Sequence, residues 1–241
     1  MDYRPGKIEE LTFYSEELQE EMTLLLYLPK TYSPLYKYSL LIAQDGKDYF
    51  MFGKLSRTLD ELSEEEEIEP TIAVGIPYKS VDERRKMYHP DGEKVEQYVR
   101  FLAHELLSYL DDLLPTHKMG GTRTLIGDSL GGTVSLLTAL QYPHTFNKVV
   151  AQSPLVNETL LNKVADFSSP NALHIYHTIG LQETEVKTTD KKIADFLTPN
   201  RELYQLLSTK GFSYFYEEME GNHTWRYWQK DMPRALRKML S

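Results

Sequence analysis

The stretch TLIGDSLGG, residues 124–132, decides how the rest of this 241-residue chain is interpreted. It begins with an apolar run that favours a β-strand and continues into the pattern Gly127-x-Ser129-x-Gly131. A serine between two such glycines, after a strand and before a helix, is typical of a sharp turn that exposes the serine hydroxyl. The same pattern also occurs in ordinary glycine-rich bends. The neighbouring elements therefore have to distinguish a nucleophile from a packing turn.

Apolar periodicity predicts the elements on both sides of this turn. Short β-favourable runs bounded by turn residues predict strands at 7–15, 21–29, 38–46, 71–77, 122–127, 146–154, 172–180 and 212–220. Apolar residues at helical spacing predict helices at 51–67, 93–114, 130–143, within 190–210 and at 225–240. We interpret 78–92 as a loop.

The repeated alternation of strand and helix predicts an α/β fold. Its mostly parallel central sheet should have helices on both faces, joined by right-handed crossovers. No linker-like composition, internal repeat or low-complexity tract interrupts the pattern, so we expect a single domain over residues 1–241. In such sheets, reactive groups gather beyond the carboxyl ends of the strands. Ser129 occupies that position.

The context of Ser129 favours a nucleophile. Glycines at 127 and 131 allow the backbone to turn sharply, and the following helix points free N–H groups toward a developing oxyanion. A phosphate-binding turn is the alternative. The stretch, however, lacks both the Lys-Ser/Thr of a P-loop and the G-x-G-x-x-G spacing of a dinucleotide site.

A nucleophilic serine needs a base, and position along the chain selects His223 from the seven histidines. His223 lies in EGNHTWRYW, after the last predicted strand and before the last helix, again at the carboxyl edge. His89 lies in the 78–92 loop and is the alternative base. His174 and His177 are three residues apart in one strand, so they face opposite sides and form no metal pair. We predict no metal site.

The third member of the site should be an acid that orients the imidazole. The loop after the penultimate predicted strand offers Glu183, Glu185 and Asp190. Glu183 follows the strand most closely and is our choice. A Glu183 carboxylate within about 3.2 Å of a His223 ring nitrogen would support this choice.

Composition excludes several classes of function. The chain has 27 basic and 36 acidic residues, for a net charge of −9, and such a surface repels nucleic-acid backbones. Cysteine is absent, which excludes disulfides, thiolate metal sites and a cysteine nucleophile. No stretch is apolar enough to span a membrane, and the N-terminal residues carry no signal-peptide pattern. We expect a cytoplasmic protein with no nucleic-acid or membrane partner, which could form a homo-oligomer.

Several segments together resemble the enterochelin esterase-like, esterase-D-type family of the α/β-hydrolases. They include LLIAQDGKDYF, IAVGIPYKSVDERRKMYHP, IGDSLGG, IGLQETE and EGNHTWRYWQKDMPRAL, and they follow the family's order from about residue 20 onward. The resemblance implies an α/β-hydrolase fold and a serine esterase. An enzyme of this kind needs no metal or organic cofactor, and its substrate would be a small-molecule ester.

The resemblance also implies roles for individual residues. It makes Ser129 the nucleophile, His223 the base and Glu183 the acid. In relatives, the residue after the Asp-Gly of the third strand lends its N–H to the oxyanion hole. That position corresponds to Lys47, and the Leu130 N–H is the second donor.

Aromatic and basic residues near the expected site are candidates for substrate contact. Tyr78, Tyr88, Trp225 and Trp228 could line an acyl or alcohol pocket, although packing explains them equally well. Arg84, Arg85 and Lys86 could attract an anionic substrate, and a solvated charge run is the simpler interpretation.

Two other activities and one non-enzymatic role stay open at this stage. A siderophore trilactone could be the substrate, or an alcohol could intercept the acyl-enzyme and make the protein an acyltransferase. A non-catalytic binding protein of the same fold is disfavoured, because degenerate members usually lose the serine or the histidine.

Overall fold

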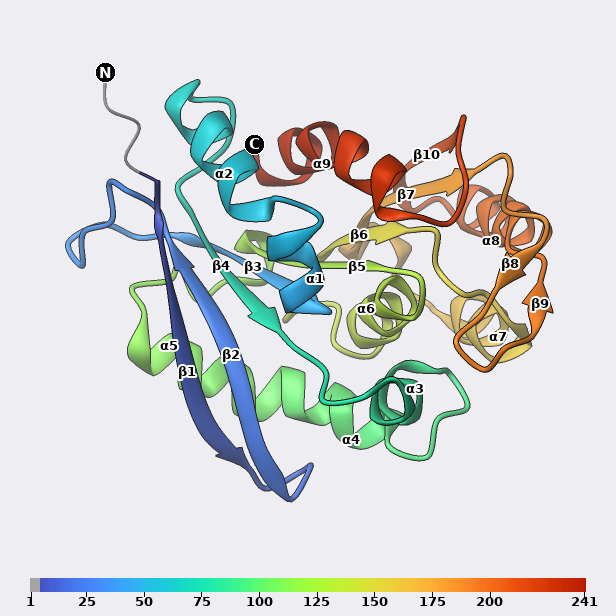
Figure 1. The fold of residues 1–241 in the computed structure, drawn as a ribbon, viewed down its shortest axis with the longest axis horizontal. Helices are drawn as coiled ribbons and strands as arrows, with labels where there is room; N and C mark the ends of the chain where they lie inside the picture. The colour runs from blue at the N-terminus through green and yellow to red at the C-terminus, as the bar shows by residue number, and fades with distance from the viewer. Residues whose placement is uncertain (1–4) are drawn as a thin grey trace.

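Eight strands form one central sheet in the computed structural model, which describes residues 5–241 (Figure 1). The strands are β1 (Lys7–Ser15), β2 (Glu20–Leu28), β3 (Ser39–Gln44), β4 (Thr71–Ile76), β5 (Arg123–Asp128), β6 (Lys148–Gln152), β7 (His174–Gly180) and β10 (Ser213–Met219). Their order across the sheet is β1-β2-β4-β3-β5-β6-β7-β10. From β4 to β10 all neighbours are parallel, whereas β1 and β2 pair antiparallel at one edge. The predicted mostly parallel sheet is confirmed.

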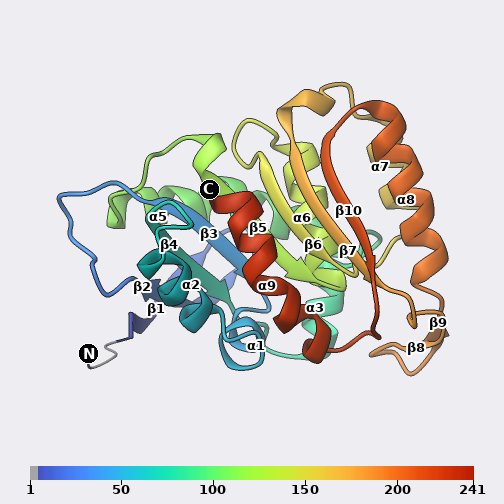
Figure 2. The same ribbon diagram turned by 90° about the horizontal axis from the view of Figure 1, so that it is seen from above.

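Helices cover both faces of this sheet (Figures 1 and 2). On one face lie α1 (Gly46–Met51), α2 (Leu55–Glu64) and α9 (Trp225–Leu240). On the other lie α3 (Val81–Tyr88), α4 (Val95–Arg100), η1 (Phe101–Leu106), α5 (Leu107–Leu113), α6 (Leu130–Gln141), α7 (Glu158–Asp166) and α8 (Leu197–Lys210). Within the described chain, no helix combines the length and apolar character needed to cross a bilayer.

The central strands are apolar throughout because both of their faces are covered. All six residues of β3 are buried. Leu40 and Ile42 pack into the core under α4 to α8, whereas Leu41 and Ala43 point to the opposite core under α2 and α9. Successive side chains of a strand alternate between faces, so one apolar run supplies both layers.

The N-terminal hairpin closes one edge of the sheet. β1 and β2 pair over nine residues, from Lys7 opposite Leu28 to Ser15 opposite Glu20. β1 exposes alternate side chains to solvent, as an edge strand does. One face of β1 is therefore open to solvent, and the sequence of β1 is more polar than that of β3 or β4.

Helix α1 packs against the neighbouring strand β4 through a glycine pair. A Cβ on Gly75 would lie 2.7 Å from the Gly46 Cα and 2.8 Å from the Phe50 Cε2. Gly46 is the first residue of α1 and Gly75 is near the end of β4. The carboxyl ends of β3 and β4 can therefore approach closely only while both positions lack a side chain.

The structure differs from the sequence prediction at 78–92, which contains the helix α3 and is not a simple loop. Ser80 begins this helix, and its hydroxyl accepts a hydrogen bond from the Glu83 N–H at 3.2 Å. The segment VDERRKMY is mostly charged, and its buried face consists of Arg84, Met87 and Tyr88. A buried arginine breaks the apolar periodicity by which helices are recognised.

Two further helices and one irregular turn were absent from the prediction. α1 is a single short helix directly after β3, and α7 is capped by Asn157, which accepts from the Leu160 N–H at 3.1 Å. The predicted helix 93–114 is present from 95 to 113, but its middle, Phe101–Leu106, is a π-helix. The predicted helix at 225–240 matches α9.

Replacing Gly75 by alanine should destabilise the protein by about 1–3 kcal/mol, because the new methyl group overlaps Gly46 and Phe50. Urea unfolding of the variant measures this loss. Gly121→Ala is the matched control, since the only atom near its added Cβ is the Asn147 Nδ2 at 3.9 Å. Equal stability of the two variants would show that the β4–α1 contact tolerates a side chain.

Candidate active site

Ser129 lies on the sharp turn between β5 and α6. Its backbone has φ 51° and ψ −125°, a conformation that residues other than glycine rarely adopt. The turn is held by the Ser129 N–H, which donates to the Gln152 carbonyl at 2.9 Å. The Ser129 carbonyl accepts from the Thr133 N–H at 3.1 Å. Neighbouring elements thus hold a strained residue in place and leave its side chain partly exposed.

The two glycines of the motif let the turn close. A Cβ on Gly127 would lie 2.1 Å from the Gly131 carbonyl carbon, so any side chain there would separate strand from helix. A Cβ on Gly131 would lie 3.1 Å from both the Asp45 Oδ2 and the Gln44 Cβ. The turn therefore packs directly against the end of β3, which leads into Lys47.

The structure brings His223 and Glu183 together. The His223 Nδ1 lies 2.6 Å from the Glu183 Oε2, within the distance expected from the sequence. Glu183 follows β7 and His223 follows β10, two parallel neighbours whose carboxyl ends share one edge. The Glu183 side chain is 1% exposed and that of His223 is 15% exposed.

The second oxygen of Glu183 is also held. The Glu183 Oε1 accepts from the Ser153 hydroxyl at 2.7 Å and from the Gly180 N–H at 2.9 Å. The Trp228 Nε1 donates to the same Ser153 hydroxyl at 2.9 Å, and its ring lies edge-on to His223 with centroids 4.9 Å apart. The Ser153 and Gly180 donors fix the orientation of the carboxylate toward the histidine.

The other two candidate acids lie elsewhere. Glu185 is exposed to solvent. The Asp190 carboxylate accepts from the Thr188 hydroxyl at 2.5 Å and lies 3.4 Å from the Arg85 guanidinium. Of the three acids considered from the sequence, Glu183 is the one with a hydrogen bond to His223.

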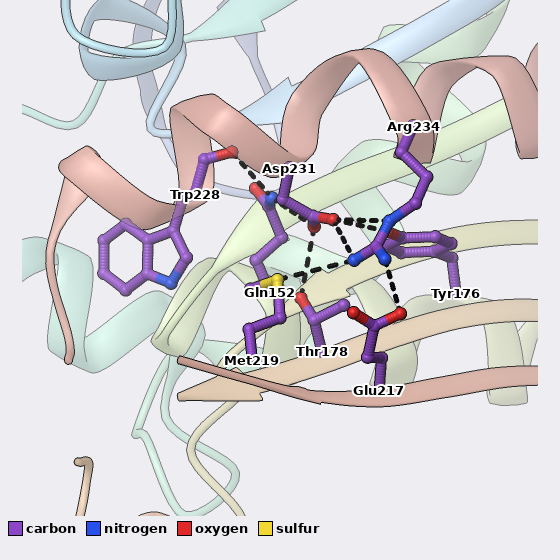
Figure 3. Close-up of polar contacts among 8 residues, drawn as sticks. All are labelled: Gln152, Tyr176, Thr178, Glu217, Met219, Trp228, Asp231 and Arg234. Atoms are coloured by element: carbon purple, nitrogen blue, oxygen red, sulfur yellow. Dashed lines mark hydrogen bonds and ion pairs between the residues drawn. The ribbon is translucent and has the colours of Figure 1, made fainter. Parts of the chain in front are cut away.

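A buried polar network fixes helix α9 beneath this site (Figure 3). Asp231 accepts from the Gln152 side-chain amide at 3.0 Å, the Tyr176 hydroxyl at 2.5 Å and the Arg234 guanidinium at 2.6 Å. The Gln152 amide also donates to the Trp228 carbonyl at 3.0 Å. Because Gln152 precedes Ser153 and its carbonyl holds Ser129, one network ties the serine turn to the helix that carries Trp228.

Ser129 and His223 line the same small cavity, of about 80 Å³. Leu130, the first residue of α6, lines it as well. The first N–H groups of a helix have no intrahelical acceptor, so the Leu130 N–H is available to a ligand in this space. Arg84 and Arg85 from α3 form part of the opposite wall.

Lys47 lines a different cavity. It lies in the first turn of α1, immediately beyond Asp45 and Gly46, and its side chain reaches a larger space of about 530 Å³. The loop that carries Lys47 packs against the serine turn through Asp45. Its backbone N–H is the group that the family resemblance assigns to an oxyanion hole.

Arg84 is buried and paired, so the interpretation of 84–86 as a solvated charge run is wrong for this residue. The Arg84 guanidinium donates to both oxygens of Asp45, at 2.7 and 2.5 Å. Both side chains are nearly inaccessible, at 10% and 2% exposed. The sequence alone gave no signal of this pair, because its members are far apart and each is a common surface residue.

A second buried carboxyl group lies next to the serine. Burial, with the charge of Asp45 as a further cause, raises the pKa of Asp128 to about 8. Asp128 is therefore mostly neutral at pH 7, and the Asp45 charge is compensated by Arg84. The serine turn thus carries no uncompensated negative charge from these two groups.

The aromatic candidates separate into two groups. Tyr78 and Tyr88 line the 530 Å³ cavity, and Tyr88 is almost fully buried there. Trp225 lines neither this cavity nor the small one and packs edge-on against Tyr49 and Trp228, with centroids 4.8 and 5.5 Å apart. The packing interpretation therefore fits Trp225 better than a substrate contact does.

The remaining candidate histidines do not line the cavity that contains Ser129. His89 ends helix α3, and its Nδ1 accepts from the Asp91 N–H at 3.1 Å. His174 is exposed, whereas His177 is buried on the same strand, in agreement with their opposite facing. Among residues 5–241, no group of three or more histidine, aspartate or glutamate side chains is arranged to hold a metal ion.

The sheet order, the strained serine turn and the histidine–carboxylate pair define a member of the α/β-hydrolase fold class. The enterobactin esterase FES from Shigella flexneri, solved with enterobactin, superimposes with a TM-score of 0.83. It is 19% identical, and the match covers 97% of this chain and 58% of that one. At this identity the likeness establishes the fold and not the substrate.

Sequence comparison assigns the chain to a family. The family model described as "Putative esterase" matches residues 15–239, and the chain belongs to this family. "Uncharacterized protein YjcH" of Bacillus subtilis (strain 168) is 53% identical over 98% of both chains. An acetyl esterase of Caldicellulosiruptor saccharolyticus is 24% identical over 96% of this chain and 97% of its own. The prediction of an esterase is confirmed.

Protonation of His177 should destabilise the protein in mild acid. Burial lowers its pKa from 6.5 to about 4. The neutral ring suits its partners: the Tyr214 hydroxyl lies 2.5 Å from Nδ1, and the Asn200 Oδ1 lies 2.6 Å from Nε2. The unfolded chain binds the proton first, so stability falls as pH drops from 6.5 toward 4.

Urea unfolding at pH 7.5 and pH 5 measures this effect, which should amount to about 2 kcal/mol. His177→Gln should remove most of this pH-dependent loss, whatever its own stability at pH 7.5. His174→Gln on the same strand is the control and should keep the loss, since His174 is exposed. An unchanged pH dependence in His177→Gln would contradict the assignment.

Proposed function

We propose that the protein hydrolyses small carboxylic esters through an acyl-enzyme, with Ser129 as nucleophile, His223 as general base and Glu183 as the orienting acid. One observation carries the proposal. Ser129 and His223 line one cavity, and the His223 Nδ1 lies 2.6 Å from the buried Glu183 carboxylate. This is the arrangement by which a base removes a serine proton while a carboxylate stabilises the imidazolium.

Acylation follows from this arrangement. The His223 Nε2 accepts the hydroxyl proton as the Ser129 Oγ attacks the acyl carbon, and the carbonyl oxygen becomes an oxyanion. The Glu183 carboxylate accepts a hydrogen bond from the Nδ1–H of His223 and stabilises the positively charged ring. Collapse of the tetrahedral intermediate breaks the bond to the alcohol oxygen, which leaves with the proton from His223.

Deacylation repeats these steps with water in place of the serine. His223 takes a proton from water, the hydroxide attacks the acyl carbon, and the bond to the Ser129 Oγ breaks with return of the proton. The carboxylic acid is released and the free serine is regenerated. No other reactant enters the cycle.

The oxyanion hole is the second part of the proposal. The Leu130 N–H is the first proposed donor, because Leu130 lines the cavity and begins α6, where the helix dipole favours an anion. The Lys47 N–H, in the first turn of α1, is the second proposed donor, because its loop packs on the serine turn through Asp45. A neutral Asp128 helps, since a charge there would repel the oxyanion.

The size of the catalytic cavity favours small groups on one side of the ester. About 80 Å³ holds only a few heavy atoms, such as an acetyl group. The acetyl esterase from Caldicellulosiruptor saccharolyticus, similar over nearly its full length, agrees with this preference. We therefore propose acetate and other short esters as the first substrates to test.

Ser129→Ala should abolish hydrolysis of p-nitrophenyl acetate, with a loss of turnover on the order of a millionfold, because the nucleophile is removed. His223→Ala should be comparably damaging. Release of p-nitrophenol measures both, and circular dichroism checks that each variant folds. His89→Ala is the control and should retain wild-type turnover.

Labelling by a fluorophosphonate provides a measurement that is independent of the chosen ester. The wild type should incorporate one label per chain at Ser129, and Ser129→Ala should incorporate none. A purified Ser129→Ala protein with full esterase activity, or an unlabelled wild type, would rule out Ser129 as the nucleophile.

Glu183→Gln should lower turnover by roughly 10⁴-fold while the protein stays folded, because the amide cannot stabilise the imidazolium. Single substitutions Glu185→Gln and Asp190→Asn are the matched controls and should have little effect. If Asp190→Asn were the damaging change, a different acid would serve His223 during the reaction.

A further inference from the structure

A groove of about 530 Å³ lies beside the catalytic cavity. Its walls come from the outer hairpin β1–β2, from α1, from the end of β4, from α3 and from α4. The apolar and aromatic residues that line it are Ile8, Met22, Leu25, Phe50, Met51, Ile76, Pro77, Tyr78, Met87, Tyr88 and Tyr98. The volume lies in the range of pockets for organic ligands.

Some of these apolar side chains are unusually accessible. Ile8 is 45% exposed and Met51 is 59% exposed, although both are large and apolar. Exposed apolar side chains that gather around one hollow indicate a surface that a ligand covers. At the inner end the groove is closed by Tyr88, whose hydroxyl lies 3.2 Å from that of Tyr98.

The charged residues of the groove are mostly neutralised by protein partners. Lys79 pairs with Glu20 at 2.6 Å. Glu83 pairs with Lys94 at 2.9 Å, and Arg84 is held by Asp45. Because these charges are already paired, a charged ligand would gain little from them. The groove therefore suits an apolar ligand.

Two residues connect the groove to the reaction site. Arg84 lines both the groove and the small cavity that contains Ser129 and His223. Lys47 lines the groove, and its backbone N–H is the proposed second oxyanion donor. An ester carbonyl held at Ser129 would therefore have the groove directly next to one of its two arms.

We propose that this groove binds an apolar arm of the ester, a medium-length alkyl or an aromatic group that is too large for the 80 Å³ cavity. The inference rests on the proposed function. It makes the preferred substrate asymmetric, with a short group in the catalytic cavity and a longer apolar group in the groove. Thr23 and Met51 then help to determine specificity.

The experiment compares kcat/KM for long and short esters in two series. Four methylenes separate p-nitrophenyl hexanoate from the acetate, which tests the acyl arm. The same difference separates hexyl acetate from ethyl acetate, followed by acid release, which tests the alcohol arm. In the wild type, kcat/KM should rise in one series by up to roughly fourfold for each methylene that the groove buries.

Two substitutions should remove this preference. Thr23 is partly exposed on β2 and lines the groove, so Thr23→Trp fills the groove at a position where a strand tolerates an aromatic residue. Met51→Glu places a carboxylate on the apolar wall. Each should lower the ratio of long-ester to short-ester kcat/KM on the order of tenfold.

Met119→Glu is the matched control. Met119 is also 59% exposed, but it does not line the groove, so its ratio should equal that of the wild type. Thermal unfolding confirms that the three variants fold. Because the hydrophobic and steric variants act independently, loss of one through misfolding still leaves the other to decide.

The outcomes separate this inference from the proposed function. A lowered ratio in the acyl series or in the alcohol series supports the groove and assigns its arm. Ratios that stay at the wild-type value in both series, with hydrolysis still dependent on Ser129, overturn the groove but leave the esterase mechanism intact. Failure of all four esters together with failure of fluorophosphonate labelling overturns both.

Discussion

Close approach of backbones at the carboxyl edge of the sheet is the constraint on which the site depends. Gly127 and Gly131 bring β5 and α6 so near that no side chain fits between them, and this forces Ser129 into its strained conformation. Gly46 and Gly75 allow an equally close approach between α1 and β4. With both contacts in place, the serine and the start of α6 line one cavity, and Asp45, just before α1, packs against the serine turn. The site is thus assembled by the backbone before any catalytic side chain is added.

Charge compensation completes what the backbone begins. Each buried carboxyl group around the serine is handled differently: Glu183 is stabilised by donors and faces the histidine, Asp45 is neutralised by Arg84, and Asp128 keeps its proton. Of the three, Glu183 is the one that contacts His223, and in the proposed mechanism it stabilises the imidazolium. The network of Figure 3 supports this assignment indirectly, since Asp231 fixes the helix from which Trp228 reaches Ser153.

The sequence predicts those features that leave a local pattern. The buried strands, α9 and the placement of Ser129, Glu183 and His223 at one edge all follow from apolar runs and parallel topology. The prediction of a loop at 78–92 was wrong, because α3 buries Arg84, and a buried arginine is indistinguishable in sequence from a solvated one. Asp45, the partner of Arg84, lies far from it in the sequence, so the pair can be recognised only in the folded structure. The same limitation explains why the groove, built from five separate segments, has no signature in the sequence.

The π-helical turn at Phe101–Leu106 has a consequence for how this chain can change in length during evolution. A π-helical turn holds one more residue than an α-helical turn, and each residue of a regular helix rotates the following side chains by about 100°. Upstream of the turn, Tyr98 meets Tyr88 at the groove, and downstream Leu110 is buried in the core. Loss of a single residue here would restore a regular helix but rotate one of these two faces away from its partner. Deletion of a residue within this segment would therefore displace either Tyr98 at the groove or Leu110 in the core.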